Sequence, residues 1–411
     1  MATKYDVFEV LYKKNSPVKP SEVVAILRKT TSSYHAIYQI LLDLEKDNLI
    51  KRTEDGFQSI YSKKHDMLYR LISYCIANGI NYNDLLSKNI VAFISKALCK
   101  RRFTIADFDI NPRTFTKYVE ILSKSGLLIV LSKKPVEATI PYNSFLRNLL
   151  YYFNHKCLHA KTKDDGYIKE IEKELIVFKR LKKKNERKYQ EIIEKYEIRF
   201  VQHSLNLEGN PITLPETKQI LEQHIIPPNV RQETIEEVQD YQKAVQQMLL
   251  YSNKPVTKET IIKYHHLAMQ HKPEFAGNVR NISVHIKNNP NFKVAAVKEI
   301  EEKLKSLLQT YNEFSKKKKN TLTEVLEFSA YFHNEFQHIH PFIDGNSRTT
   351  RLLTFHLLRA NDIPIIDIPL GLLEEYLFAT KGAKKRSDKE LNHVLQRVIL
   401  YNLKNINEQL K

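Results

Sequence analysis

The sequence has few glycines, few cysteines and no long apolar run. Only 9 of its 411 residues are glycine, whereas helix-forming residues follow one another over long stretches, so we expect a mostly α protein. The 3 cysteines (Cys75, Cys99 and Cys157) are far apart and form no Cys-x-x-Cys pair. This excludes a disulfide framework and a zinc ribbon and favours a reducing compartment. No apolar run reaches about 18 residues, so we expect no membrane span.

Acidic residues are outnumbered by basic ones. The chain has 65 lysines and arginines against 47 aspartates and glutamates, a formal net charge of +18. Such a balance predicts an anionic partner, with nucleic acid as the first candidate. The lysine runs at 182–184 and 316–319 are equally explained as solvated helix faces. The opening residues contain no apolar core of a signal peptide, so we expect a cytoplasmic protein.

The N-terminal third predicts two small modules of helices followed by a hairpin. Residues 1–65 show three helical patterns, with a break at 16–21 that ends in an N-cap serine, and then two β-like runs around Asp55-Gly56. Residues 88–142 repeat this order, with a candidate recognition helix at 111–122 and β-like runs at 127–131 and 136–140. Both modules resemble winged helix-turn-helix domains. A helix at 66–87 connects them, and a helical connector at 143–197 follows.

In winged helices the third helix enters the DNA major groove. The side chains that would make this contact are Ser32, Ser33, Tyr34 and His35 in the first module, and Arg113, Thr114 and Lys117 in the second. Two alternatives stay open: an ordinary helix surface, or a module for protein docking or dimerisation. DNA is therefore an expected partner if those alternatives fail, whereas a homodimer is expected if the modules serve dimerisation.

The most informative stretch runs from Ala330 to Arg351. A helical pattern ends at His340-Pro341, because proline disfavours a helical preceding residue, and a new helix starts after Asp344-Gly-Asn-Ser. The free N–H groups at such a helix start form an anion site, here at Gly345, Asn346 and Ser347. Arg348 and Arg351 follow on neighbouring faces and suit phosphate oxygens. Asp344 suits Mg²⁺, and His340 is a candidate base.

These parts are the ones that phosphoryl or nucleotidyl transfer needs. The sequence His340-Pro-Phe-Ile-Asp-Gly-Asn-Ser-Arg-Thr-Thr-Arg351 resembles the Fic motif, H-x-F-x-D/E-G-N-G-R-x-x-R, at every fixed position except Ser347. The resemblance implies an all-α C-terminal fold at 198–400 with a β-hairpin flap. It also implies a protein adenylyltransferase that uses ATP and Mg²⁺. His340 would be the base, Asp344 the Mg²⁺ ligand, and the loop with Arg348 and Arg351 would hold the phosphates.

The family resemblance extends to three further segments. Ser204-Leu-Asn-Leu-Glu208-Gly209 resembles the family's inhibitory helix, S/T-x-x-x-E-G/N, in which the glutamate pairs with the second motif arginine, here Arg351. Residues 275–297 fall at the flap, whose nucleotide-lining positions would be Val284, His285, Ile286 and Lys287. Tyr376 falls where the family places an aromatic residue beside adenine; a core tyrosine is an equal alternative.

The predicted reaction is therefore transfer of AMP from Mg·ATP to a Ser, Thr or Tyr hydroxyl of a protein, inhibited by Glu208. The sequence leaves three alternatives open. The same site would remove AMP from a modified protein if Glu208 aligns a water molecule. A DNA-binding regulator with a weak site would follow if Ser347 strains the loop. Transfer of a different nucleotide moiety is the third alternative.

Overall fold

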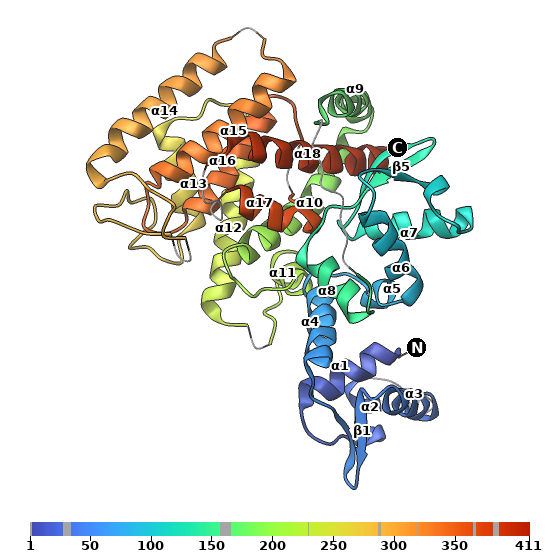
Figure 1. The fold of residues 1–411 in the computed structure, drawn as a ribbon. Coiled ribbons are helices and arrows are strands. Elements are labelled where there is room, and N and C mark those ends of the chain that lie inside the picture. The colour runs from blue at the N-terminus through green and yellow to red at the C-terminus, as the bar shows by residue number, and fades with distance from the viewer. Residues whose placement is uncertain are drawn as a thin grey trace. The chain divides into compact units, whose positions relative to one another are not determined.

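The computed structural model describes residues 2–27, 34–156, 166–228, 230–286, 289–317, 319–364, 367–380 and 386–411. It confirms a mostly helical chain and divides it into two compact units (Figure 1). The first unit comprises residues 1–100 and 144–159, and the second comprises 101–143 and 160–411. The described helices include none that combines the length and apolarity of a membrane span. The predicted second module at 88–142 is thereby divided between the two units.

The first unit contains the predicted order of three helices and a hairpin. Its helices are α1 (Lys4–Lys14), α2 (Pro20–Ile26), α3 (Tyr34–Lys46), α4 (Lys63–Ala77), α5 (Tyr82–Leu85), α6 (Lys88–Leu98) and α8 (Ser144–Tyr152). Strands β1 (Ile50–Thr53) and β2 (Gly56–Ser59) pair antiparallel, with Thr53 opposite Gly56, as the Asp55-Gly56 turn predicts. The predicted serine N-cap of α2 is wrong: the helix starts at Pro20, with Lys19 as its N-cap, because proline suits the first helical position.

The predicted groove contacts lie partly on exposed helix surface. His35 is exposed near the start of α3, Tyr34 is 45% exposed, and Ser32 and Ser33 lie outside the described residues. Arg113 and Lys117 are exposed and Thr114 is half-buried on α7 (Pro112–Lys124), whose opposite face is buried. DNA binding through these residues stays a prediction.

The second unit begins with a three-stranded antiparallel sheet and continues as a helical assembly. The sheet has the order β3-β5-β4, from β3 (Phe103–Thr104), β4 (Ile129–Lys133) and β5 (Val136–Thr139). The short 3₁₀ helices are η2 (Ile105–Asp107), η3 (Val297–Glu299) and η4 (Leu370–Leu372). The remaining helices are α9 (Ile168–Lys184), α10 (Glu186–Asn206), α11 (Leu214–Leu221), α12 (Gln232–Tyr251), α13 (Lys258–Ala268), α14 (Ile300–Ser315), α15 (Leu322–Ile339), α16 (Asn346–Ala360), α17 (Leu373–Ala379) and α18 (Asp388–Leu410).

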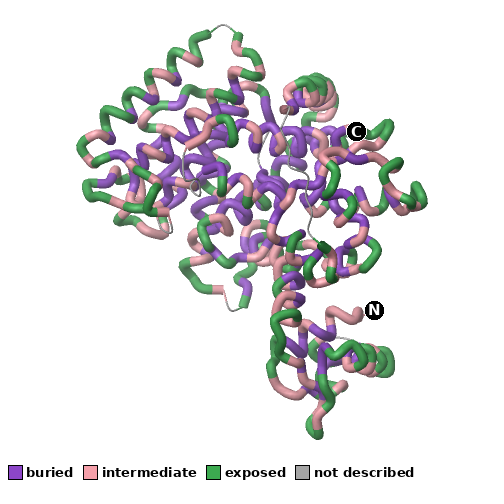
Figure 2. The backbone as a smooth tube through the Cα atoms, viewed as in Figure 1, coloured by how far each residue is buried: buried purple, intermediate pink, exposed green. Residues whose placement is uncertain are grey.

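Helix α16 lies at the centre of this assembly. It packs against α12, α13 and α15, and every residue from Arg348 to Leu358 is buried (Figure 2). The burial includes polar side chains, which must therefore find partners inside the protein. The threonines of α16 remain compatible with burial because Thr349, Thr350 and Thr354 each donate to the carbonyl four residues earlier. The helix that carries the motif arginines is therefore held rigidly.

The predicted β-hairpin flap is wrong within the described residues. Residues 275–286 and 289–297 contain no strand ladder, only one isolated bridge between Val279 and Phe342. The alternation of Val284, His285 and Ile286 between half-buried and exposed is present, but the asparagines and proline that follow do not support ladder pairing. The flap is instead an irregular segment, tied down by Arg280.

Candidate active site

The loop between α15 and α16 has a conformation fixed by three of its own residues. His340 ends α15 in a left-handed conformation with φ 50°, and Gly345 precedes α16 with φ 77°. The Asn346 side chain accepts from the Phe342 N–H at 3.0 Å and donates to the Phe342 carbonyl at 2.8 Å. The side-chain amide of Asn346 thus holds the loop in place, and the backbone N–H of Asn346 is left to bind an anion.

The start of α16 presents backbone donors without a side-chain cap. Gly345 is the N-cap residue, and no side chain accepts a hydrogen bond from the first turn. Asn346 and Ser347 are the first two helical residues, where N–H groups have no partner within the helix. Ser347 has no positive φ, so it fits this turn without backbone strain. Serine in place of the motif's second glycine is therefore compatible with the backbone conformation of this turn.

Gly345 is the position where a side chain is not tolerated. A Cβ at Gly345 would lie 2.7 Å from Met269 Sδ and 3.0 Å from His265 Nε2, in a left-handed backbone. We expect Gly345→Ala to lower the free energy of unfolding by about 1–3 kcal/mol. Ser347→Gly is the matched control and should change it by less than about 1 kcal/mol. Chemical denaturation measures both; equal stability of the two variants would contradict the assigned backbone conformation.

His340 is a buried imidazole with one ring nitrogen hydrogen-bonded to the backbone. Its Nδ1 lies 3.2 Å from the Gln337 carbonyl, which can only accept, so Nδ1 carries the proton and Nε2 keeps its lone pair. Burial lowers the pKa of His340 to about 4, although the hydrogen bond to the Gln337 carbonyl and the charges of Glu208 and Asp344 act in the opposite direction. The imidazole is therefore neutral at physiological pH and able to accept a proton.

Asp344 and Arg348 form a charged group beside the loop. Asp344 Oδ1 lies 3.3 Å from Arg348 and Oδ2 lies 3.4 Å from Lys272 Nζ. Burial alone would raise the pKa of Asp344, but Arg348 and Lys272 hold it below its ordinary value. Arg348 is 3% exposed and also pairs with Glu237 of α12. The carboxylate is thus ionised and half-exposed, as a Mg²⁺ ligand must be.

The loop offers one carboxylate, that of Asp344, as a ligand for a magnesium ion. Mg²⁺ commonly binds one or two carboxylates together with substrate phosphates and water. Asp344 has an exposed side-chain fraction of 44%, so its oxygens are open to such a complex. The described residues hold no group of three or more His, Cys, Asp or Glu suited to a metal. The residues present therefore fit a metal that arrives with a nucleotide.

Arg351 is paired with the segment predicted to be inhibitory. Its Nε donates to Ser204 Oγ at 2.6 Å, and its Nη2 donates to Glu208 Oε1 at 2.9 Å. Glu208 lies in the turn after α10, which ends at Asn206 and not at 209, and Gly209 follows with φ 92°. Burial lowers and Glu208 raises the pKa of Arg351, with a net increase. The guanidinium is therefore bound to this segment through both Ser204 and Glu208.

Tyr376 is a buried partner in the same network. Its hydroxyl lies 2.7 Å from His333 Nε2, and burial raises its pKa. Asn334 in turn connects His333 Nδ1 to Asp388. With 3% exposure, Tyr376 agrees with the core alternative of the sequence analysis; contact with adenine stays a prediction.

The flap is fastened to the catalytic loop by a buried arginine. Arg280 donates to the His340 carbonyl at 2.7 Å, to the Ile282 carbonyl at 2.9 Å and to the Ala295 carbonyl at 2.5 Å. Val284 and Ile286 are half-buried and His285 is exposed, whereas Lys287 lies outside the described residues. These flap positions remain predicted nucleotide contacts.

Sequence reasoning missed His265, Arg280 and Glu237. His265 accepts from the Gly277 N–H at 2.9 Å, donates to the Asp344 carbonyl at 2.9 Å and stacks on Phe342. It therefore joins the flap to the loop, and burial lowers its pKa to about 4. No motif marks these residues, since each acts through contacts between segments far apart in the chain.

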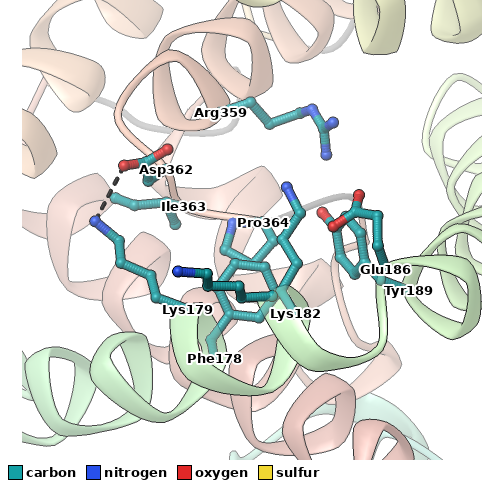
Figure 3. A pocket seen from close by; sticks show the side chains of 10 residues that line it. Phe178, Lys179, Lys182, Glu186, Tyr189, Arg359, Asp362, Ile363 and Pro364 are labelled. Atoms are coloured by element: carbon teal, nitrogen blue, oxygen red, sulfur yellow. Dashed lines mark hydrogen bonds and ion pairs between the residues drawn. The ribbon is translucent and has the colours of Figure 1, made fainter.

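A basic groove of about 310 Å³ lies elsewhere in the second unit (Figure 3). It is lined by Lys179, Lys182, Lys183, Glu186 and Arg359 together with apolar residues, and Lys179 pairs with Asp362 at 3.0 Å. Most of these cations occupy the last turns of α9 and α16, where they offset the negative helix end. The groove contains none of the motif residues, so it is separate from the candidate site.

Residues 255–358 match the Fic/DOC family, over the flap, the loop and most of α16. This chain carries a Fic/DOC family domain. A Fic domain containing signaling protein from Bacteroides thetaiotaomicron shares the fold, with a TM-score of 0.50 and 21% identity over 59% of this chain and 97% of that one.

Curated relatives of the Fic domain are named protein adenylyltransferases. Protein adenylyltransferase Fic of Nematostella vectensis is 29% identical over 171 residues, which cover 40% of this chain and 38% of that protein. Protein adenylyltransferase fic-1 of Caenorhabditis elegans is 27% identical over 183 residues, which cover 43% of this chain and 34% of that protein. The match spans little more than a third of these relatives, so it supports the Fic domain and not the whole protein's activity.

Proposed function

We propose that this protein transfers AMP from Mg·ATP to a hydroxyl side chain of a protein, and that Glu208 inhibits the transfer. The observation that carries the proposal is the common neighbourhood of four groups. A neutral His340, an ionised Asp344, the uncapped start of α16 and a pair of buried arginines surround one loop. The named activity of the curated relatives supports the same reaction.

Each residue of the site has a separate role in the proposed reaction. His340 Nε2 accepts the proton of the attacking hydroxyl, and its Nδ1–H holds the ring on the Gln337 carbonyl. The N–H groups at Asn346 and Ser347 and the guanidinium groups of Arg348 and Arg351 stabilise phosphate charge as pyrophosphate leaves. A Mg²⁺ ion on Asp344 would neutralise phosphate charge when bound. Glu208 forms an ion pair with Arg351, so the γ-phosphate competes with this carboxylate for the arginine.

The proposal is tested by asking which phosphate of ATP remains attached to the protein after the reaction. A Glu208→Gly variant is incubated with Mg²⁺ and ATP labelled at either the α- or the γ-phosphate. We expect denaturation-resistant label on protein from the α-phosphate only, because the bond to pyrophosphate breaks. Retention of γ-label alone would identify phosphoryl transfer and contradict the proposal. ATP replaced by UTP or GTP tests transfer of another nucleotide moiety.

Removal of AMP is the second candidate reaction. The negative charge of Glu208 acts on His340 and raises the pKa of the imidazole, so the carboxylate and the imidazole belong to one electrostatic environment. Incubating the unaltered protein with an AMP-modified protein separates the reactions: release of AMP that depends on Glu208 would favour removal over transfer.

A further inference from the structure

The second phosphate-binding candidate, Arg348, also has a carboxylate partner. Its Nη1 forms an ion pair with Glu237 Oε1, from the second turn of α12, and its Nη2 reaches Asp344. Arg348 is buried, and its Nε–H has no hydrogen-bond partner among the described residues. An unsatisfied buried donor is costly and marks a place for an incoming acceptor such as a phosphate oxygen. Both motif arginines are thus occupied by carboxylates in this conformation.

Glu237 also reaches the turn that carries Glu208. Its second oxygen accepts from Asn210 Nδ2 at 2.6 Å, and Asn210 lies two residues after Glu208. The Asn206 side chain holds this turn by donating to the Asn210 carbonyl at 2.8 Å. A continuous set of contacts therefore runs from Arg348 through Glu237 and Asn210 to the Glu208 turn.

The geometry points to Glu237 as a positioning residue: a second carboxylate that holds Arg348 away from triphosphate and links it to the Glu208 turn. This inference rests on the proposed function, because it concerns the affinity of the same site for Mg·ATP. A triphosphate that takes Arg348 must displace Glu237, and displacement removes the acceptor that holds Asn210. Binding of phosphate at Arg348 is thereby coupled to loosening of the segment that occupies Arg351.

The two glutamates have separable effects on catalysis. Glu237→Gln removes the charge that holds Arg348, but its amide oxygen can still accept from Asn210 and keep Glu208 on Arg351. The nucleotide therefore binds more tightly without a correctly placed γ-phosphate. Loss of the Glu208 charge frees the γ-phosphate site and raises the transfer rate. An effect of Glu237 on folding alone would not produce this division between binding and transfer.

The test is the dissociation constant of Mg·ATP measured by calorimetry on the full chain. We expect Glu237→Gln to bind about tenfold more tightly than the unaltered protein, a change of about 1.4 kcal/mol, while transfer stays low. Glu236→Gln is the matched control, since Glu236 is the preceding residue and its carboxylate accepts a hydrogen bond from Gln232 of the same helix. Glu237→Asp keeps the charge and should restore an affinity within about threefold of the unaltered protein.

The outcomes separate this inference from the proposed function. Equal affinity of folded Glu237→Gln and Glu236→Gln would overturn the role of Glu237, even if Glu208→Gly transfers AMP. Failure of Glu208→Gly to transfer AMP, with tighter binding in Glu237→Gln, would instead overturn the reaction. If thermal melting shows that Glu237→Gln does not fold, Glu237→Ala must give the same gain in affinity; no gain there also overturns the inference.

Discussion

Glu208→Gly is expected to raise the rate of AMP transfer by roughly 10- to 1,000-fold. Glu208 Oε1 lies 2.9 Å from Arg351 Nη2, where a γ-phosphate oxygen would otherwise bind. A carboxylate about 4 Å from a phosphate charge costs about 1 kcal/mol in water and about 4 kcal/mol at protein surfaces, and each 1.4 kcal/mol is about tenfold in rate. Initial rates of α-phosphate label incorporation into the protein itself measure the effect.

The control for this variant keeps the charge. Glu208→Asp shortens the side chain by one methylene but retains a carboxylate beside Arg351, so the rate should remain within a few-fold of the unaltered protein. Melting temperatures of the variants test whether the fold is loosened in general. We expect no general loosening from Glu208→Gly, because the next residue, Gly209, already ends this turn with a positive φ. An unchanged rate in Glu208→Gly, with Mg·ATP bound tightly by both forms, would show that Glu208 does not inhibit.

His340→Ala in the Glu208→Gly background is expected to lower the transfer rate by roughly 10²- to 10⁴-fold, the usual contribution of a general base. Nucleotide affinity should change little, because the phosphate ligands lie on the helix start and the arginines. His266→Ala, an exposed histidine of α13, is the matched control. Unchanged transfer in His340→Ala would refute its assignment as the base.

The pH profile gives a second readout of His340. The base works only in its neutral form, which predominates above its pKa of about 4. The rate of the Glu208→Gly variant should therefore be flat from about pH 5 to pH 8 and fall to half near pH 4 as the ring gains a proton. An ordinary histidine would give half the rate near its usual value of about 6.5. Half-activity at that pH would contradict the buried, neutral imidazole.

The loop between α15 and α16 is predictable from the sequence, whereas the residues that contact it from other helices are not. His340-Pro341 ends one helix and Gly345 precedes the next, so a helix, a tight loop and a second helix are predictable from neighbouring residues alone. Glu237 and Asn210 carry no motif; their importance arises only when α12 is packed beside the start of α16. Residues 284–286 alternate in burial like a strand but lack a partner ladder among the described residues, which is why the hairpin prediction failed.

The burial of Arg351 could likewise not be read from its spacing. The sequence indicates that Arg348 and Arg351 lie on neighbouring helix faces, but both residues are almost fully buried. Helix α12 packs against α16, and Ser204 of α10 accepts a hydrogen bond from Arg351. Each arginine then needs a counter-charge, and the chain supplies Glu208 and Glu237. Nucleotide binding thus becomes an exchange of carboxylate for phosphate.

The most direct measurement is a crystal structure of the Glu208→Gly variant with Mg²⁺ and a non-hydrolysable ATP analogue, beside that of the unaltered protein in the same solution. We predict that the γ-phosphate in the variant lies within hydrogen-bond distance of Arg351, with the α-phosphate facing His340 Nε2. In the unaltered protein, Arg351 should keep Glu208 and exclude the γ-phosphate. A γ-phosphate bound to Arg351 in both proteins, or to neither, would contradict the account.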